Sequence, residues 1–147
     1  MSESILKIIP TNPDYVPATV LQVQAKDFLE KIFTNNNVDF QTLAEVEFVD
    51  AGENFEPILC NVCSTEISAD EWQDQMDEAF QKQFSDLSFQ TSCKHHTSLN
   101  DLNYQSSAGF AKFIISVADT QIELSKGEIL ELEKILKTYL RVIWAFY

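Results

Sequence analysis

Three cysteines and two histidines carry most of the chemistry that this sequence offers. Cys60 and Cys63 form a Cys-x2-Cys pair, and Cys93 follows thirty residues later with His95 and His96 close behind it. Thiolate sulfur and imidazole nitrogen are the usual ligands of structural zinc, and a two-residue gap lets a tight turn bring two thiolates onto one ion. Because every cysteine and histidine of the chain falls in these two segments, the pattern predicts a structural zinc site. Its ligands would be Cys60, Cys63 and Cys93, with His96 or His95 as the fourth.

Two other interpretations of the cysteines stay open. Free cysteine is among the most buried residue types, so the three could be small core residues beside solvated histidines. A Cys-x2-Cys pair also serves redox chemistry when a helix N-terminus follows it and lowers the thiol pKa. Four residues, from Ser64 to Ile67, separate the pair from the next helix cap, which disfavours the redox interpretation.

A catalytic zinc ion would keep three protein ligands and an open position for water. That position would open near the loop 94–109 if only the three cysteines bound, or if His95 and His96 exchanged, and Asp101 would then be the candidate base. A zinc-dependent hydrolase is therefore the alternative hypothesis. Three thiolates weaken zinc as a Lewis acid, and Asn100-Asp101 more often caps a turn, so we prefer the structural site. With three glycines the chain has no glycine-rich phosphate loop, and it shows no Ser/His/Asp triad spacing.

Length, composition and charge narrow the classes of partner. A chain of 147 residues with 45% hydrophobic residues is expected to fold as a single domain, residues 1–147. The 23 acidic residues outnumber the 10 basic ones and give a net charge of -13. Such a polyanion repels nucleic acid and anionic membranes, so a nucleic-acid-binding zinc ribbon ranks last. A basic protein is the partner that this charge favours.

The sequence also predicts a cytoplasmic location. Its first residues, MSESILKIIP, lack the basic and then apolar pattern of a secretory signal. Its longest apolar runs are far shorter than the ~20 residues of a membrane-spanning helix. An odd number of cysteines without an export signal favours a metal site or free thiols over disulfides.

Strand and helix patterns alternate along the chain. Period and turn signals predict strands at 5–9, 46–48, 55–59, 87–93, 110–117 and 140–147, the last one buried, with 46–48 and 55–59 paired as a hairpin. Apolar spacing predicts helices over 21–32, 68–85 and 129–139, with capping boxes at Ser68, Ser125 and, less clearly, Thr19. The segment 94–109 has no clear period and is expected to be a long loop. The fold class is thus α+β: a mixed or antiparallel sheet with about three helices packed on it and a zinc-knuckle-like loop pair.

Several motifs together resemble a family of small uncharacterised bacterial proteins. They span most of the chain and comprise Phe48–Glu56, the Cys60-x2-Cys63 knuckle, Ser98–Leu102 (SLNDL), Gly109–Phe113 (GFAKF) and Arg141–Tyr147 (RVIWAFY). The family has adjacent cysteines where this chain has Ser92-Cys93, and it usually ends in His-Tyr where this chain has Phe146-Tyr147. The first departure implies that His95 or His96 replaces a thiolate, or that this member binds metal poorly or not at all. The resemblance implies no activity.

The helix at 68–85 is expected to be amphipathic, with an acidic outer face that contains Asp74, Asp77 and Glu78. Such a face is most often simply solvated, and it can also dock a basic partner. The function hypothesis is accordingly a small acidic protein with a structural Cys3His zinc, acting as a protein-interaction module of the adaptor or immunity type.

Overall fold

A computed structural model describes residues 4–52 and 57–147. Nine strands and three helices are described in these ranges. In chain order they are β1 (Ser4–Pro10), α1 (Thr19–Ile32), β2 (Val38–Val49), β3 (Ile58–Leu59), β4 (Glu66–Ile67), α2 (Ala69–Gln81), β5 (Ser88–Gln90), β6 (His96–Ser98), β7 (Asn103–Tyr104), β8 (Gly109–Ala118), α3 (Lys126–Leu136) and β9 (Leu140–Phe146). None of the described helices is long and apolar enough to cross a membrane.

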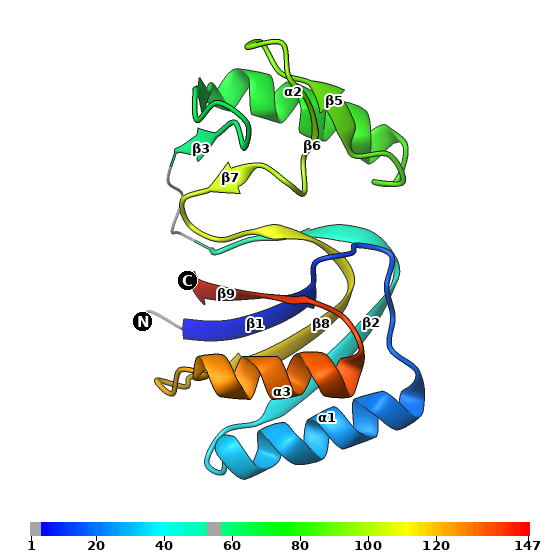
Figure 1. Ribbon diagram of the computed structural model, residues 1–147, viewed down its shortest axis with the longest axis vertical. Helices are drawn as coiled ribbons and strands as arrows, with labels where there is room; N and C mark the ends of the chain where they lie inside the picture. Colours follow the sequence, from blue (N-terminus) through cyan, green and yellow to red (C-terminus); the bar gives the residue numbers. More distant parts are fainter. Residues whose placement is uncertain (1–3, 53–56) are drawn as a thin grey trace.

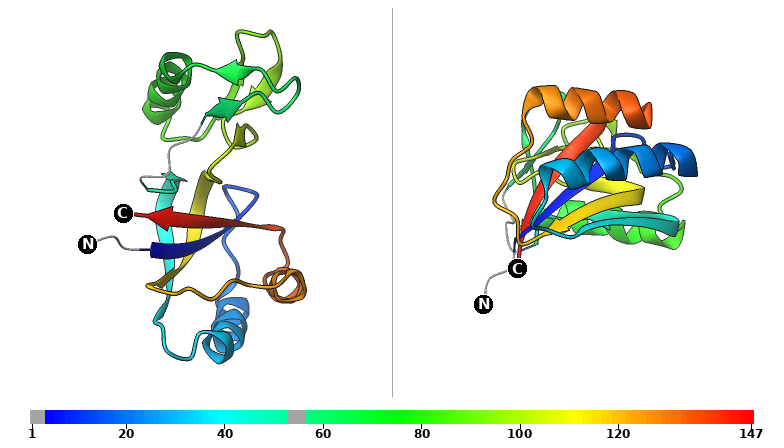
Figure 2. Two further views of the ribbon diagram at one scale, coloured as in Figure 1. Left: turned by 90° about the vertical axis from the view of Figure 1, so that its left-hand side faces the viewer. Right: turned by 90° about the horizontal axis from the view of Figure 1, so that it is seen from below.

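The largest sheet has four antiparallel strands in the order β2-β8-β1-β9. Helices α1 and α3 lie together on one face of it, below the sheet in Figure 1 and side by side in the view from below in Figure 2. Strand residues alternate between faces, so Leu6 and Ile8 of β1 and Phe113 and Ile115 of β8 point toward these helices. Their side chains form a buried core with Leu132 and other helix residues.

A second layer comes from residues 57–104, which lie between β2 and β8 in the chain and on the opposite side of the sheet from α1 and α3 (Figure 1). It contains α2, a three-stranded sheet in the order β4-β3-β7, and the two-stranded sheet β5-β6. Its buried cluster includes Ile58, Cys60 and Trp72 together with Val46 of β2 and Phe110 of β8. The two layers therefore share apolar packing, and the predicted α+β class is confirmed.

Asn100 and Arg141 tie the two layers together. The Asn100 side chain is 5% exposed; its Nδ2 donates to the Thr11 carbonyl (2.8 Å) and its Oδ1 accepts from the Phe110 N–H (2.9 Å). Nη1 of Arg141 donates to the carbonyls of Asn100 (3.0 Å) and Ala108 (2.8 Å). A Cβ on Gly109 would lie 2.5 Å from that Nη1, which explains the glycine. Three of the motifs quoted above thus meet at one polar contact.

Ser68 and Ser125 are the N-caps of α2 and α3 as predicted, but only Ser125 forms the predicted capping box, because the Glu71 carboxylate accepts from the Ser92 N–H instead of the Ser68 N–H. Ser68 Oγ accepts from the Glu71 N–H (3.1 Å), and Ser125 with Glu128 forms a complete reciprocal capping box. The expected box at Thr19 is wrong. The α1 N-cap is Ala18 with no side-chain hydrogen bond, and Nε2 of Gln22 donates to the Pro17 carbonyl instead (2.9 Å).

Two strand predictions and one loop prediction need correction. The 46–48 and 55–59 segments do not form a hairpin, because β2 pairs with β8 while β3 pairs with β4 and β7; Phe55 lies outside the described residues. The segment 94–109 is not a continuous loop, since it contains β6 and β7. The last strand, β9, lies at a sheet edge, and only its Ile143 and Ala145 are buried.

Candidate metal centre

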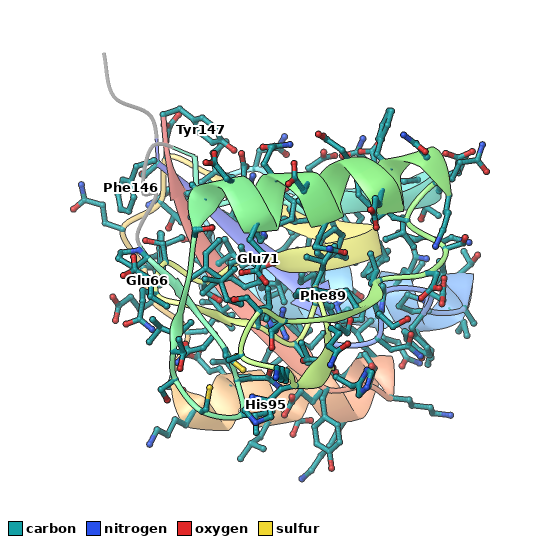
Figure 3. All side chains as sticks on the ribbon, turned by 90° about the horizontal axis from the view of Figure 1, so that it is seen from above. Glu66, Glu71, Phe89, His95, Phe146 and Tyr147 are labelled. Carbon is teal, nitrogen blue, oxygen red and sulfur yellow. The ribbon has the colours of Figure 1, made fainter. Side chains whose placement is uncertain are left out.

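Four potential ligands converge where two hairpin turns of the second layer meet. Cys60, Cys63, Cys93 and His95 each offer one ligand atom, and these atoms all lie within 4.8 Å of one another. Sγ of Cys60 is 3.7 Å from Nδ1 of His95. Figure 3 shows His95 beside sulfur atoms at the edge of this layer. Three thiols and an imidazole are thus placed to surround one metal ion.

The first turn connects β3 to β4 and carries Cys60 and Cys63. The Cys60 N–H donates to the Thr65 carbonyl (2.8 Å), and the Ser64 N–H donates to the Cys60 carbonyl (2.9 Å). Ser64 takes a left-handed φ of 63°, which closes the turn. The Val62 N–H points at Sγ of Cys60 (3.4 Å) and stabilises negative charge on that sulfur.

The second turn connects β5 to β6 and carries Cys93 and His95. The Thr91 N–H donates to the His95 carbonyl and the Lys94 N–H donates to the Thr91 carbonyl, both at 2.9 Å. Lys94 has a left-handed φ of 66°. Oγ1 of Thr91 accepts from the His95 N–H (3.0 Å) and lies 3.0 Å from Sγ of Cys93. Each half of the cluster is therefore a tight, hydrogen-bonded turn, as a knuckle-like loop pair requires.

The structure places His95, and not His96, with the thiols. His96 is exposed and belongs to β6, where it pairs with Gln90. His95 directly precedes β6, and neighbouring side chains of extended backbone point to opposite faces, so the geometry that brings His95 to the thiols turns His96 away from them. Of the two histidines predicted as alternatives for the fourth ligand, His95 therefore joins the cluster and His96, the first choice, does not.

The donor set fits zinc. Sulfur atoms bound tetrahedrally at about 2.3 Å lie roughly 3.8 Å apart, so a spacing within 4.8 Å needs only small side-chain adjustments to close on an ion. The three cysteines are free thiols, and Cys60 is fully buried while Cys63 is exposed. Soft thiolates with one imidazole are typical of zinc and disfavour magnesium or calcium. These residues can hold a zinc ion with one face of the site near solvent.

Neighbouring hydroxyls and thiols shift two of the thiol pKa values in opposite directions. Oγ1 of Thr65, 3.1 Å from Sγ of Cys63, and the Thr65 backbone lower the pKa of Cys63 to about 6. The Thr91 hydroxyl acts in the same sense on Cys93, but desolvation and the thiols of Cys63 and Cys60 outweigh it and raise the pKa of Cys93. Cys63 is thus a ready thiolate, while Cys93 needs a cation beside it to ionise at neutral pH.

Three supporting residues escaped the sequence analysis. Thr65 and Thr91 each lie two residues from a candidate ligand, and the hydroxyl of each contacts the sulfur of that cysteine. A threonine at this spacing is the sequence signal that could have identified them. Glu71 lies in the first turn of α2, and its Oε2 accepts from the Ser92 N–H (2.8 Å), which binds α2 to the second turn. No local sequence signal marks that contact.

Asp101, the candidate base of the hydrolase hypothesis, is exposed and lies in the turn after β6. Its N–H donates to the Ser98 carbonyl (2.9 Å), and it does not belong to the ligand cluster.

Comparison with known proteins gives no relative: no family model, no curated protein and no solved structure matches this chain. The case for the metal centre therefore rests on the geometry.

Proposed function

We propose that this protein binds one zinc ion structurally through Cys60, Cys63, Cys93 and His95, and that it acts as an acidic protein-interaction module. The observation that carries the metal assignment is the convergence of the four ligand atoms within 4.8 Å from two separate turns. Small buried cysteines with a solvated histidine would have no reason to meet in this way.

A structural role is favoured over a catalytic one. Four protein ligands fill the tetrahedral sphere of zinc and leave no position for a water molecule. Asp101 lies outside the ligand cluster, so the base of the hydrolase alternative is not among the residues that surround the ion. The zinc would instead cross-link the β3–β4 and β5–β6 turns, which flank α2 in the chain.

This cross-link would fix the orientation of α2. The helix begins directly after β4, and the Glu71–Ser92 hydrogen bond binds its first turn to the second ligand-bearing turn. Its remaining carboxylates, on Asp70, Asp74, Asp77 and Glu78, are exposed. With a net charge of -13, the chain is suited to attract a basic protein, in an adaptor or immunity-type role.

Metal analysis of the full chain, purified without chelators, tests the metal assignment. Structural zinc binds tightly enough to survive gentle purification, so we expect about one zinc per chain. Less than about 0.2 zinc per chain, with no zinc uptake by the reduced protein, would contradict the proposal. A Cys60→Ser, Cys63→Ser double variant is the matched control and should lose the metal.

A further inference from the structure

The surface between the C-terminal half of α2 and the middle of β2 is hollowed. A groove of about 420 Å³ lies there. It is lined by Phe80 of α2 and by Phe84 just after the helix, by Glu45, Val46 and Glu47 of β2, and by two glutamines. Figure 3 shows α2 crossing over the strands of the large sheet on this side. The groove is remote in sequence from the four ligand residues and shares none of them.

Aromatic rings lead from the core to the open side of the groove. Phe110 is fully buried, the Phe84 ring lies 5.4 Å from it, and the Phe80 ring lies 5.8 Å from Phe84. Phe80 itself is 70% exposed. A large apolar side chain that is exposed beside a groove indicates a binding surface, because burying that side chain under a partner lowers the free energy.

The backbone departs from regular geometry on both sides of the groove. The pairing of β2 with β8 shifts register between Thr42 and Glu47, so the lining residues belong to an irregular part of the strand. Gln83 and Phe84 take consecutive left-handed φ values of 57° and 55°. This conformation is costly for residues other than glycine, and it turns the chain back so that Phe80 of α2 and Phe84, which follows the helix, line one hollow.

The rim of the groove is acidic. Glu45 and Glu47 are exposed on either side of the buried Val46, and neither forms an ion pair with any residue that the structure describes. Asp77, one helical turn before Phe80, is exposed as well. Lys82, the C-cap residue directly after α2, already pairs with Asp86 (3.9 Å). The groove thus has an apolar floor and a rim of unpaired carboxylates. A peptide segment with one apolar side chain between basic residues would complement both.

We infer that this groove docks a basic segment of a partner protein, with one apolar side chain of that segment seated on Phe80, Phe84 and Val46. The inference rests on the proposed role as a protein-interaction module and adds the surface and the chemistry of the partner. Charge attraction brings the segment to the acidic rim of the groove, and burial of the Phe80 ring discriminates among basic segments.

The test is an NMR titration of the full-length, zinc-loaded, ¹⁵N-labelled chain with the probe peptide acetyl-KRKLKRK-amide. Acetyl-KRKSKRK-amide, which has the same charge and no apolar anchor, is the matched peptide. We expect the largest shifts at the groove residues and about fivefold tighter binding of the leucine peptide. Equal affinities for the two peptides, or shifts centred elsewhere, would overturn the inference by showing only general charge attraction.

Variants of the protein sharpen the result. Phe80→Ser should remove the preference for leucine, and Glu45→Gln with Glu47→Gln should weaken binding about tenfold. Tyr139→Ser is the matched apolar control, because Tyr139 is 77% exposed on a different part of the surface, and Asp27→Asn with Glu30→Gln on α1 is the matched charge control. If the controls weaken binding as much as the groove variants, the groove is not the docking site.

Zinc content measured on the same samples separates the two claims. A protein that holds zinc but shows no leucine preference contradicts the groove and leaves the metal centre standing. A protein without zinc that still binds the leucine peptide selectively contradicts the metal centre and supports the groove.

Discussion

At the scale of single residues, the choice between two adjacent histidines decides the metal centre. Nδ1 of His95 lies 3.7 Å from Sγ of Cys60, whereas His96 belongs to the exposed part of β6. The sequence was sufficient to find the five candidate ligands, because all cysteines and histidines cluster in two segments. It could not choose the histidine, since the choice depends on where the β5–β6 turn ends and strand alternation begins.

We therefore predict opposite effects for the two histidines. His95→Ala should weaken zinc binding at least about 100-fold, because it leaves three ligands, and His96→Ala should leave the affinity within about twofold. Competition with a chromophoric chelator measures both. A loss of zinc in His96→Ala, with His95→Ala unchanged, would show that the wrong histidine has been assigned.

A polar cluster at the C-terminal end makes a separate residue-scale prediction. Nζ of Lys7 donates to Oδ1 of Asp50 (3.2 Å) and to the Tyr147 hydroxyl (2.7 Å), and that hydroxyl also bonds Asp50 (2.9 Å). Partial burial alone would raise the pKa of Asp50. The hydrogen bonds from Tyr147 and Lys7, the Lys7 charge and the Gly52 N–H outweigh it and lower that pKa below the ordinary value of an aspartate.

A carboxylate whose pKa is lowered by folding contributes stability above its unfolded pKa and loses it as the pH falls through the folded value. Asp50→Asn should therefore lower the free energy of unfolding at pH 7, and the difference from the unmodified chain should vanish in strong acid. Because Asp50 is half-exposed, the effect should stay below about 1 kcal/mol. Urea unfolding from pH 2 to 7 measures it, with Asp39→Asn as the exposed control; a difference that grows toward acid pH would contradict the assignment.

At the scale of elements, the sequence predicted best where one local signal acts alone. The Ser68 and Ser125 caps and the ten-residue strand β8 follow from short-range patterns, and the structure has them. The predicted hairpin before Cys60 failed because strand pairing is a long-range choice. Phe48 packs against Phe110 of the neighbouring strand β8, with the two ring centroids 5.1 Å apart. No local sequence pattern predicts that pairing.

The caps allow a test at this scale. Ser125→Ala removes the hydroxyl that accepts from the Glu128 N–H (3.1 Å) and breaks the capping box, so it should cost about 1 kcal/mol of folding free energy. Thr19→Ala is the control, since α1 has no side-chain cap, and it should change stability by less than about 0.5 kcal/mol. Thermal unfolding of both variants measures these changes. Equal losses of stability in the two variants would mean that the capping hydrogen bond does not stabilise α3.

At the scale of the whole molecule, one polar contact joins the two layers. Asn100→Ala would leave the buried Phe110 N–H without its acceptor and remove a donor to the Thr11 carbonyl. We expect a loss of about 2–4 kcal/mol in the free energy of unfolding, because buried unpaired groups carry their full desolvation cost. Asn103→Ala, at an exposed position of β7, is the matched control. A small loss for Asn100→Ala would show that apolar packing alone holds the layers together.

The metal centre lies in only one of the two layers. Removal of the zinc should therefore destabilise that layer more than the other. The core under α1 and α3 contains none of the four ligands, whereas Cys60 is part of the core of the second layer. Chelation of the zinc under reducing conditions should therefore raise hydrogen exchange across residues 57–104 and leave β1, β8 and β9 protected. Uniform loss of protection, or none, would contradict this division.

The most direct test of the central claim is X-ray absorption at the zinc edge of the purified full-length protein. The account predicts three sulfur ligands at about 2.3 Å and one nitrogen at about 2.0–2.1 Å, with no oxygen in the first shell. A spectrum with oxygen from water in place of a protein ligand, or a protein that binds no zinc at all, would contradict a closed structural centre built from Cys60, Cys63, Cys93 and His95.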